Sequence, residues 1–131
     1  MFKTSAVLGL LVLCAPAHSI DVSGYEKLRQ QAESQDPNRF IAKAFIESYF
    51  VGIAETLQFI QTGSQNVYLL NAPALCLPPN VQLSGPLLRA MLDAELRQPS
   101  VYQERLGPKW KEFQLIGFVM PGLLKMFPCQ K

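Results

Sequence analysis

The residues best suited to chemistry in this chain are its cysteines. Cys76 opens the run Cys76-Leu77-Pro78-Pro79-Asn80, and Cys129 ends Phe127-Pro128-Cys129 close to the C-terminus. The third cysteine, Cys14, lies in an N-terminal apolar run. If that run is removed on export, two thiols remain, and in an oxidising compartment they favour one structural disulfide. A redox-active pair would more typically be spaced as Cys-x-x-Cys.

The N-terminus fits a secretory signal peptide over residues 1–19. Lys3 supplies a short positive region, and residues 6–15 form an apolar stretch that is too short to span a bilayer. Small residues offer cleavage after Ala17 or after Ser19, and we favour Ser19. The mature chain would be one domain, residues 20–131, with no later segment apolar and long enough to span a membrane.

Removal of the signal peptide also takes away His18, the only histidine. Without an imidazole base, neither Ser-His-Asp nor Cys-His catalysis is available, and two cysteines do not make a structural zinc site. The loss of Lys3 leaves 11 basic residues (12 − 1) against 10 acidic ones, scattered along the chain. We therefore expect no enzyme, no cofactor, no metal and no nucleic-acid partner.

Hydrophobic periodicity predicts an all-α fold, a small single-domain bundle of four to five helices stapled by one disulfide. Helices are expected over residues 23–33, 36–61, about 81–97 and from 108 onward, with one more turn at 102–106. Ser23 and Glu26 form an apparent capping box for the first helix, and Pro121-Gly122 should break the last. No segment alternates with period two, so strands are not expected.

The helix predicted from Asp36-Pro37 to Gln61 is apolar on more than one side. We expect its main inward face to consist of Ile41, Phe45, Tyr49, Ile53 and Ile60, while Phe40, Phe50, Val51 and Leu57 fall outside it. Such a helix is either central in a bundle or also contacts a partner, and the central position is favoured. Gly52 costs up to ~1 kcal/mol in mid-helix, so another helix is expected to approach closely there.

Two further inward faces are expected. In the third helix the apolar stripe consists of Leu83, Leu87, Ala90, Met91 and Ala94. In the last helix it consists of Trp110, Phe113, Ile116, Gly117 and Met120.

The segment 63–75 is expected to be a loop with four apolar residues between polar ends. These are Val67, Tyr68, Leu69 and Leu70. They either fold back onto the core or present an apolar patch to a partner protein. Together with the 98–108 connection, this loop is our candidate partner-binding region.

The motifs, taken in order, resemble a known family. Tyr49 precedes Gly52-Ile53-Ala54-Glu55, residues 76–81 lead into an amphipathic helix that ends at Gln98-Pro99, and Phe127-Pro128-Cys129 closes the chain. This order is similar to the Rap/Tai-type immunity proteins of Gram-negative bacteria and covers most of the mature chain. The resemblance implies a small, periplasmic, all-helical protein with a disulfide.

The resemblance also implies a function. Members of that family bind and block peptidoglycan amidase effectors of type VI secretion systems, commonly as homodimers that occlude the active-site cleft of the effector. Cys76 and Cys129 carry over as the disulfide, and Tyr49 and Gly52 carry over as helix-packing positions. Residues that contact the effector do not carry over, because such surfaces vary with the partner.

Two other functions remain open. One is a periplasmic acid-stress chaperone, which in a mature chain without histidine would have to respond through carboxylates. The other is an uncharacterised protein of the cell envelope. The assay that separates the first from an immunity protein is client aggregation at low pH.

Overall fold

A computed structural model describes residues 19–59, 66–69 and 72–130 of the 131-residue chain. The fold is all-α with five helices, as predicted. They are α1 (Val22–Glu33), α2 (Arg39–Phe59), α3 (Gly85–Leu96), α4 (Pro99–Leu106) and α5 (Ile116–Met126). A 3-10 turn, η1 (Trp110–Glu112), precedes α5, and β1 (Asn66–Leu69) and β2 (Ala72–Cys76) form a hairpin. Residues 1–18 of the predicted signal peptide lie outside the described ranges.

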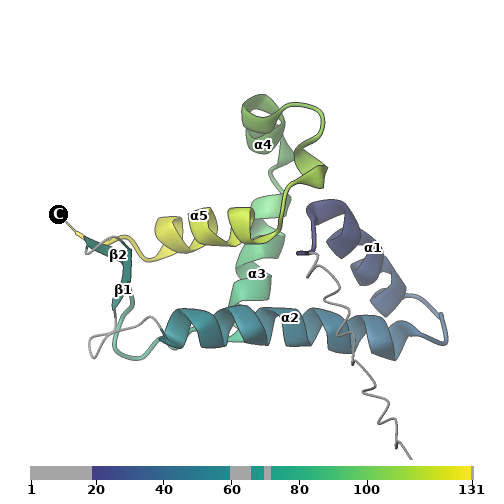
Figure 1. Ribbon diagram of the computed structural model, residues 1–131, viewed down its shortest axis with the longest axis horizontal. Coiled ribbons are helices and arrows are strands. Elements are labelled where there is room, and N and C mark those ends of the chain that lie inside the picture. The colour runs from purple at the N-terminus through teal and green to yellow at the C-terminus, as the bar shows by residue number, and fades with distance from the viewer. Residues whose placement is uncertain (1–18, 60–65, 70–71, 131) are drawn as a thin grey trace, which may run out of the picture.

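Helix α3 occupies the middle of the fold and contacts both α2 and α5 (Figure 1). Leu88 and Leu92 of α3 are fully buried, and Phe50 of α2 and Phe118 of α5 close over the same core. Helix α1 packs along α2, and α4 extends away from the rest of the bundle (Figure 1). No helix in the described ranges is both apolar enough and long enough to cross a membrane.

The disulfide joins Cys76, at the end of β2, to Cys129 near the C-terminus. Next to it, the backbone N–H of Cys76 donates to the carbonyl of Phe127 at 3.1 Å. Leu75 and Leu77, on either side of Cys76, are buried. The predicted bond is therefore confirmed, and it fixes the chain after α5 to the segment that leads into α3.

The predicted inward face of α2 is wrong in its N-terminal half, where Ile41 and Phe45 are 69% and 51% exposed. Tyr49 and Ile53 of that face are partly buried against the core, and Ile60 lies outside the described residues. The fully buried row is the neighbouring one and consists of Ala42, Ile46, Phe50, Ala54 and Leu57. Both rows have helical spacing, so periodicity alone cannot separate them. The packing of α1 and α3 against α2 decides which row is buried.

Several expected boundaries and faces also differ. Helix α1 is capped by Asp21, whose carboxylate accepts from the Gly24 N–H, and not by Ser23. Asp36 instead accepts from the Asn38 N–H in a turn, so α2 begins at Arg39. In α3 the buried residues are Gly85, Leu88, Met91 and Leu92, while Ala90 and Ala94 of the predicted stripe are exposed.

The last predicted helix is the largest difference. Residues 108–115 contain η1, and α5 begins only at Ile116 and continues through Pro121. Proline removes one helical hydrogen bond, but Gly122 and Leu123 beyond it are buried, and that burial keeps the helix in place. Phe113 and Gly117, expected inside, are exposed.

Glycines allow two close approaches, but Gly52 is not one of them. A Cβ at Gly52 would meet nothing within 4 Å among the described residues, so the expected approach of another helix there is wrong. Instead, a Cβ at Gly85 would lie 3.2 Å from the backbone of Val51, and one at Gly122 would lie 3.1 Å from Glu95. These two glycines set the distances of α3 from α2 and of α5 from α3.

We expect the double substitution Cys76→Ser, Cys129→Ser to lower the free energy of unfolding by about 4 kcal/mol, because a bond across 53 residues restricts the unfolded chain. Urea denaturation of wild type and variant measures this difference. Thiol labelling checks the bond itself. When the unreduced protein is denatured and treated with a thiol reagent, neither Cys76 nor Cys129 should react. Two reactive thiols, or equal stability, would contradict the account.

Candidate functional site

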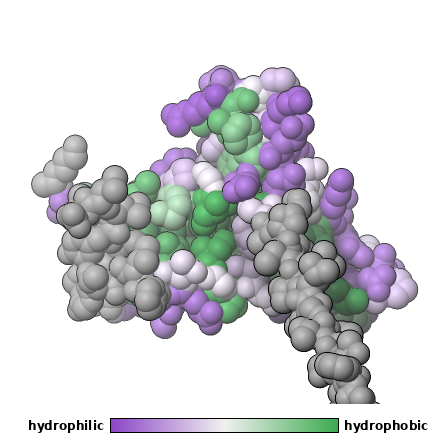
Figure 2. Space-filling model, viewed as in Figure 1, coloured by the Kyte–Doolittle hydropathy of each residue, from purple (hydrophilic) through white to green (hydrophobic). Residues whose placement is uncertain are grey.

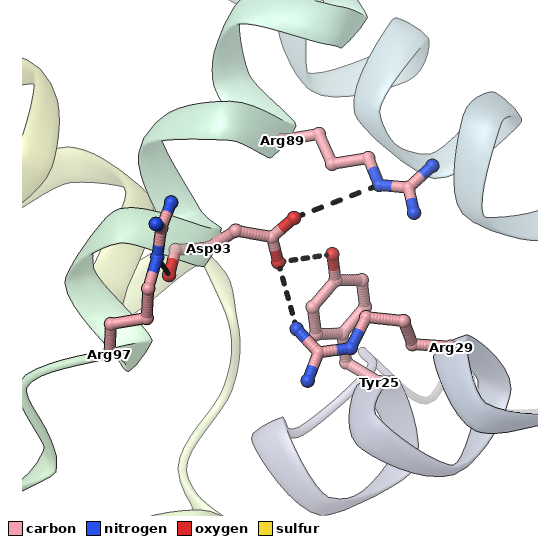
Figure 3. Close-up of polar contacts among 5 residues, drawn as sticks. All are labelled: Tyr25, Arg29, Arg89, Asp93 and Arg97. Atoms are coloured by element: carbon pink, nitrogen blue, oxygen red, sulfur yellow. Dashed lines mark hydrogen bonds and ion pairs between the residues drawn. The ribbon is translucent and has the colours of Figure 1, made fainter.

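Carboxylates are the first side chains to consider for chemistry, and the two best enclosed lie on α3. Asp93 accepts a hydrogen bond from the Tyr25 hydroxyl at 2.8 Å and lies 3.4 Å from Arg29 of α1 (Figure 3). Arg89 approaches its other oxygen at 4.0 Å, and Arg97 donates to its backbone carbonyl. Burial and then the bond to Asp93 raise the pKa of Tyr25 to about 12.

Glu95 is the second enclosed carboxylate. Lys125 of α5 donates to its two oxygens at 2.8 and 3.0 Å, and the Tyr102 hydroxyl of α4 donates to one of them. Burial raises the pKa of Glu95, but the bonds from Lys125 and Tyr102 outweigh burial, so the pKa lies below its usual range. Burial, together with the bond to Glu95, raises the pKa of Tyr102.

These two carboxylates connect helices. Asp93 links α3 to α1, and Glu95 links α3 to α4 and α5. Their partners are phenols and cations from those helices, which is the pattern of a structural link. Among the described residues, no group of three or more His, Cys, Asp or Glu side chains is arranged to hold a metal ion.

A concave surface lies where α4, η1 and α5 meet, and we call it the α4–α5 cleft. It encloses about 590 Å³. Its lining residues are Tyr102, Arg105, Leu106, Glu112, Phe113, Gln114, Ile116, Gly117, Phe118 and Pro121. The cleft is mainly apolar, with one cation and one carboxylate among the residues that line it, and it includes part of the 98–108 connection predicted to bind a partner.

Aromatic packing forms the inner wall of this cleft. The ring of Tyr102 meets that of Phe118 edge to face, with centroids 4.7 Å apart, and stacks near Trp110 at 6.3 Å. Leu106 and Phe113 remain 37% and 47% exposed. The cleft therefore combines a fixed aromatic wall with apolar side chains left open to solvent, a pattern found in protein-binding surfaces.

The hairpin contains the partner-binding residues that we predicted from the sequence. Val67, Tyr68 and Leu69 lie in β1, whereas Leu70 lies outside the described residues. The segment is therefore not only a loop as expected: Val67 pairs with Leu75, and an irregularity follows before Tyr68 pairs with Pro73. The hairpin lies near the C-terminal end of α5 (Figure 1), whereas the cleft is lined by residues from 116 to 121 in the first part of α5.

The outward side of α2 is a second uncovered surface, which the sequence assigned to the core. Phe40, Ile41 and Phe45 surround a shallow hollow of about 440 Å³. A second hollow of about 500 Å³ begins at Ser48 and reaches Ile116 of α5. Tyr49 lines the second hollow and is half-buried, with its ring edge-on to that of Phe50 and the ring centroids 5.6 Å apart. Figure 2 shows further hydrophobic surface gathered over α5.

Comparison with known proteins adds no relative. No family model matches this chain, and neither a curated protein nor a solved structure matches it.

The contacts of Glu95 generate a pH prediction. A carboxylate whose pKa is lowered in the folded state stabilises the fold above its unfolded pKa, and that stabilisation is lost as the pH falls through the folded value. We expect the free energy of unfolding to decline below about pH 4.5, and Glu95→Gln to be less stable at pH 7 and to decline less on acidification.

Glu112→Gln is the matched control, because Glu112 is an exposed carboxylate whose ion pair with Lys109 spans 3.9 Å. Urea denaturation from pH 7 to pH 3 compares the variants with wild type. Parallel curves for wild type and Glu95→Gln would show that Glu95 does not link the helices as described.

Proposed function

We propose that this protein is a periplasmic immunity protein that binds a peptidoglycan amidase effector of a type VI secretion system and occludes its active site. The α4–α5 cleft is the observation that carries this proposal. The cleft has three features that suit recognition of another protein. They are its packed aromatic wall, the exposed side chains of Leu106 and Phe113, and the opposite charges of Arg105 and Glu112.

The lining of the cleft indicates how a partner would be held. A protruding apolar side chain of the effector would enter against Tyr102 and Phe118, where desolvation contributes most to binding. Arg105 and Glu112 would set the orientation through charge. Steric inhibition needs no group that reacts, so the absence of an imidazole from the predicted mature chain fits this function.

The hairpin extends the proposed contact surface. It lies near the C-terminal end of α5, whereas the cleft lies at residues 116 to 121, and the Cys76–Cys129 bond ties its second strand to the chain after α5. Such a covalent tie lowers the conformational freedom that the segment would lose on binding. We propose that the cleft and the hairpin together cover the effector's active-site entrance.

An acid-stress chaperone is the alternative, and the link made by Glu95 is the observation that favours it. Protonation of Glu95 at low pH would weaken the attachment of α4 and α5 to α3 and expose core side chains. If the protein suppresses client aggregation near pH 2–3 and does not inhibit an amidase at neutral pH, the result would favour a chaperone over an immunity protein.

We expect Leu106→Asp to weaken binding of the amidase effector by tenfold or more, because it puts a charge where an apolar contact is desolvated. The control is Val101→Asp. Val101 lies on the same helix and is also 37% exposed, but it does not line the cleft. Calorimetric titration with a peptidoglycan amidase captured from periplasm by this protein, together with a peptidoglycan-hydrolysis assay of that amidase, measures both variants. If Leu106→Asp and Val101→Asp bind the amidase with equal affinity, the cleft is not part of the interface.

The double substitution Tyr68→Asp, Leu69→Asp tests the hairpin separately. We expect weaker effector binding, because two charges would replace apolar side chains at the proposed contact. The thermal unfolding midpoint of the variant, measured alongside, checks that it remains folded. Unchanged affinity in the same titration would exclude the hairpin from the contact surface.

A further inference from the structure

We propose that Arg29, Arg89 and Arg97 form an anion-binding surface that takes the carboxylates of an acidic segment in a partner protein. This inference goes beyond the proposed function, because it concerns a surface other than the α4–α5 cleft and does not depend on which protein is inhibited. It rests on the number, the contacts and the setting of three guanidinium groups around one carboxylate.

The three arginines lie on three sides of Asp93 (Figure 3). Arg89 precedes Asp93 by four residues in α3, and Arg97 follows it by four at the end of that helix. This spacing places both arginines on the same side of α3 as Asp93. Arg29 comes from α1. Among the described residues, Asp93 is the one carboxylate that lies within 4.0 Å of any of these guanidinium groups, so the cluster has an excess of positive charge.

The contacts of Asp93 leave the arginines incompletely paired. Arg29 Nη1 lies 3.4 Å from one carboxylate oxygen and Arg89 Nε lies 4.0 Å from the other, both farther than the ~2.7–2.9 Å of a charge-assisted hydrogen bond. Arg97 Nε donates to the backbone carbonyl of Asp93 at 3.1 Å, and not to its carboxylate. Each contact uses one nitrogen of the guanidinium. The paired nitrogens with which arginine holds a carboxylate in a bidentate contact are therefore not used by Asp93.

The setting of the cluster favours binding. The side chains of Arg29 and Arg89 are 39% and 32% exposed, so they are partly withdrawn from water and still reachable. Opposite charges attract one another more strongly there than in bulk water. Arg89 and Asp93 also line a hollow of about 530 Å³ between α2 and α3. A peptide chain that lies in this hollow can direct an acidic side chain at Arg89.

The lining of the hollow is the reason to assign an acidic protein segment and not a free anion. Val51 and Pro86 offer apolar contacts to the residues beside an acidic side chain, which an inorganic anion would not use. Glu47 lines the α2 side of the hollow and opposes an acidic ligand. Three guanidinium groups still outnumber the two carboxylates, and the removal of Glu47 should strengthen binding.

Titration with a blocked tetraglutamate peptide at low ionic strength tests the surface. We expect saturable changes in the NMR signals of the arginine Nε–H groups of Arg29, Arg89 and Arg97. A blocked tetraglutamine peptide has the same length without the charge and should leave these signals unchanged. The absence of any change at about 10 mM tetraglutamate, or equal changes with tetraglutamine, would overturn the proposal.

Substitutions separate binding from a structural role. Arg97→Gln should weaken tetraglutamate binding by about fivefold and keep the thermal unfolding midpoint, because its hydrogen bond to a carbonyl of its own helix links no other element. Arg39→Gln is the matched control. It removes the same charge from α2, where Arg39 contacts Gln35 and Phe40, and should change binding by less than about twofold. Equal weakening by the two variants would show only a general effect of net charge and would overturn the site.

Two further measurements test the nature of the ligand and its position. Inorganic phosphate should bind more weakly than tetraglutamate, since it cannot use the hollow; equal or tighter binding of phosphate would overturn the assignment to an acidic segment. Glu47→Gln should strengthen tetraglutamate binding, because it removes a like charge from the hollow. Unchanged or weaker binding by Glu47→Gln would contradict the position of the segment in the hollow.

Discussion

The close packing of α3 between α2 and α5 is the constraint on which the rest of the structure depends. Gly85 brings the start of α3 against the backbone of Val51, and Gly122 brings α5 against Glu95 and Met91. A side chain at either glycine would meet atoms at 3.1 to 3.2 Å, which is tighter than ordinary contact. The fold is therefore organised around one helix that touches both of its long neighbours.

Two consequences follow from this position of α3. Its carboxylates, Asp93 and Glu95, reach phenols and cations on α1, α4 and α5, so polar links hold the outer helices to the hydrophobic core. At the same time, α3 covers only one side of α2 and one side of α5. Phe40, Ile41 and Phe45 of α2 and the α4–α5 cleft are left open, and the proposed effector contact uses the cleft.

The sequence was sufficient for the parts of the fold that local chemistry decides. The helical class and the Cys76–Cys129 bond follow from periodicity and from the cysteine inventory. The orientation of α2 does not, because the row of Ile41 and Phe45 and the row of Ile46 and Phe50 have the same spacing. Only packing against α1 and α3 separates them.

Other features depended on contacts distant in sequence. Pro121 is a helix breaker by local rules, yet burial of Leu123 against α3 carries α5 past it. The hairpin lacks alternation because its strands are short and pair irregularly near Tyr68. Residues 102–106 of the cleft belong to the connection that the sequence marks as a candidate partner-binding region. The sequence does not indicate the other wall, because its helical spacing places Phe113 on an inward face.

The central claim is that α2 presents the row containing Ile41 outward and the row containing Ile46 inward. Thiol-labelling rates of two single-cysteine additions, Ile41→Cys and Ile46→Cys, test it most directly in dilute, native, unreduced protein. We expect Ile41→Cys to react at nearly the rate of a free thiol and Ile46→Cys to react only when the protein unfolds. Rapid labelling of Ile46→Cys with protection of Ile41→Cys would contradict the account.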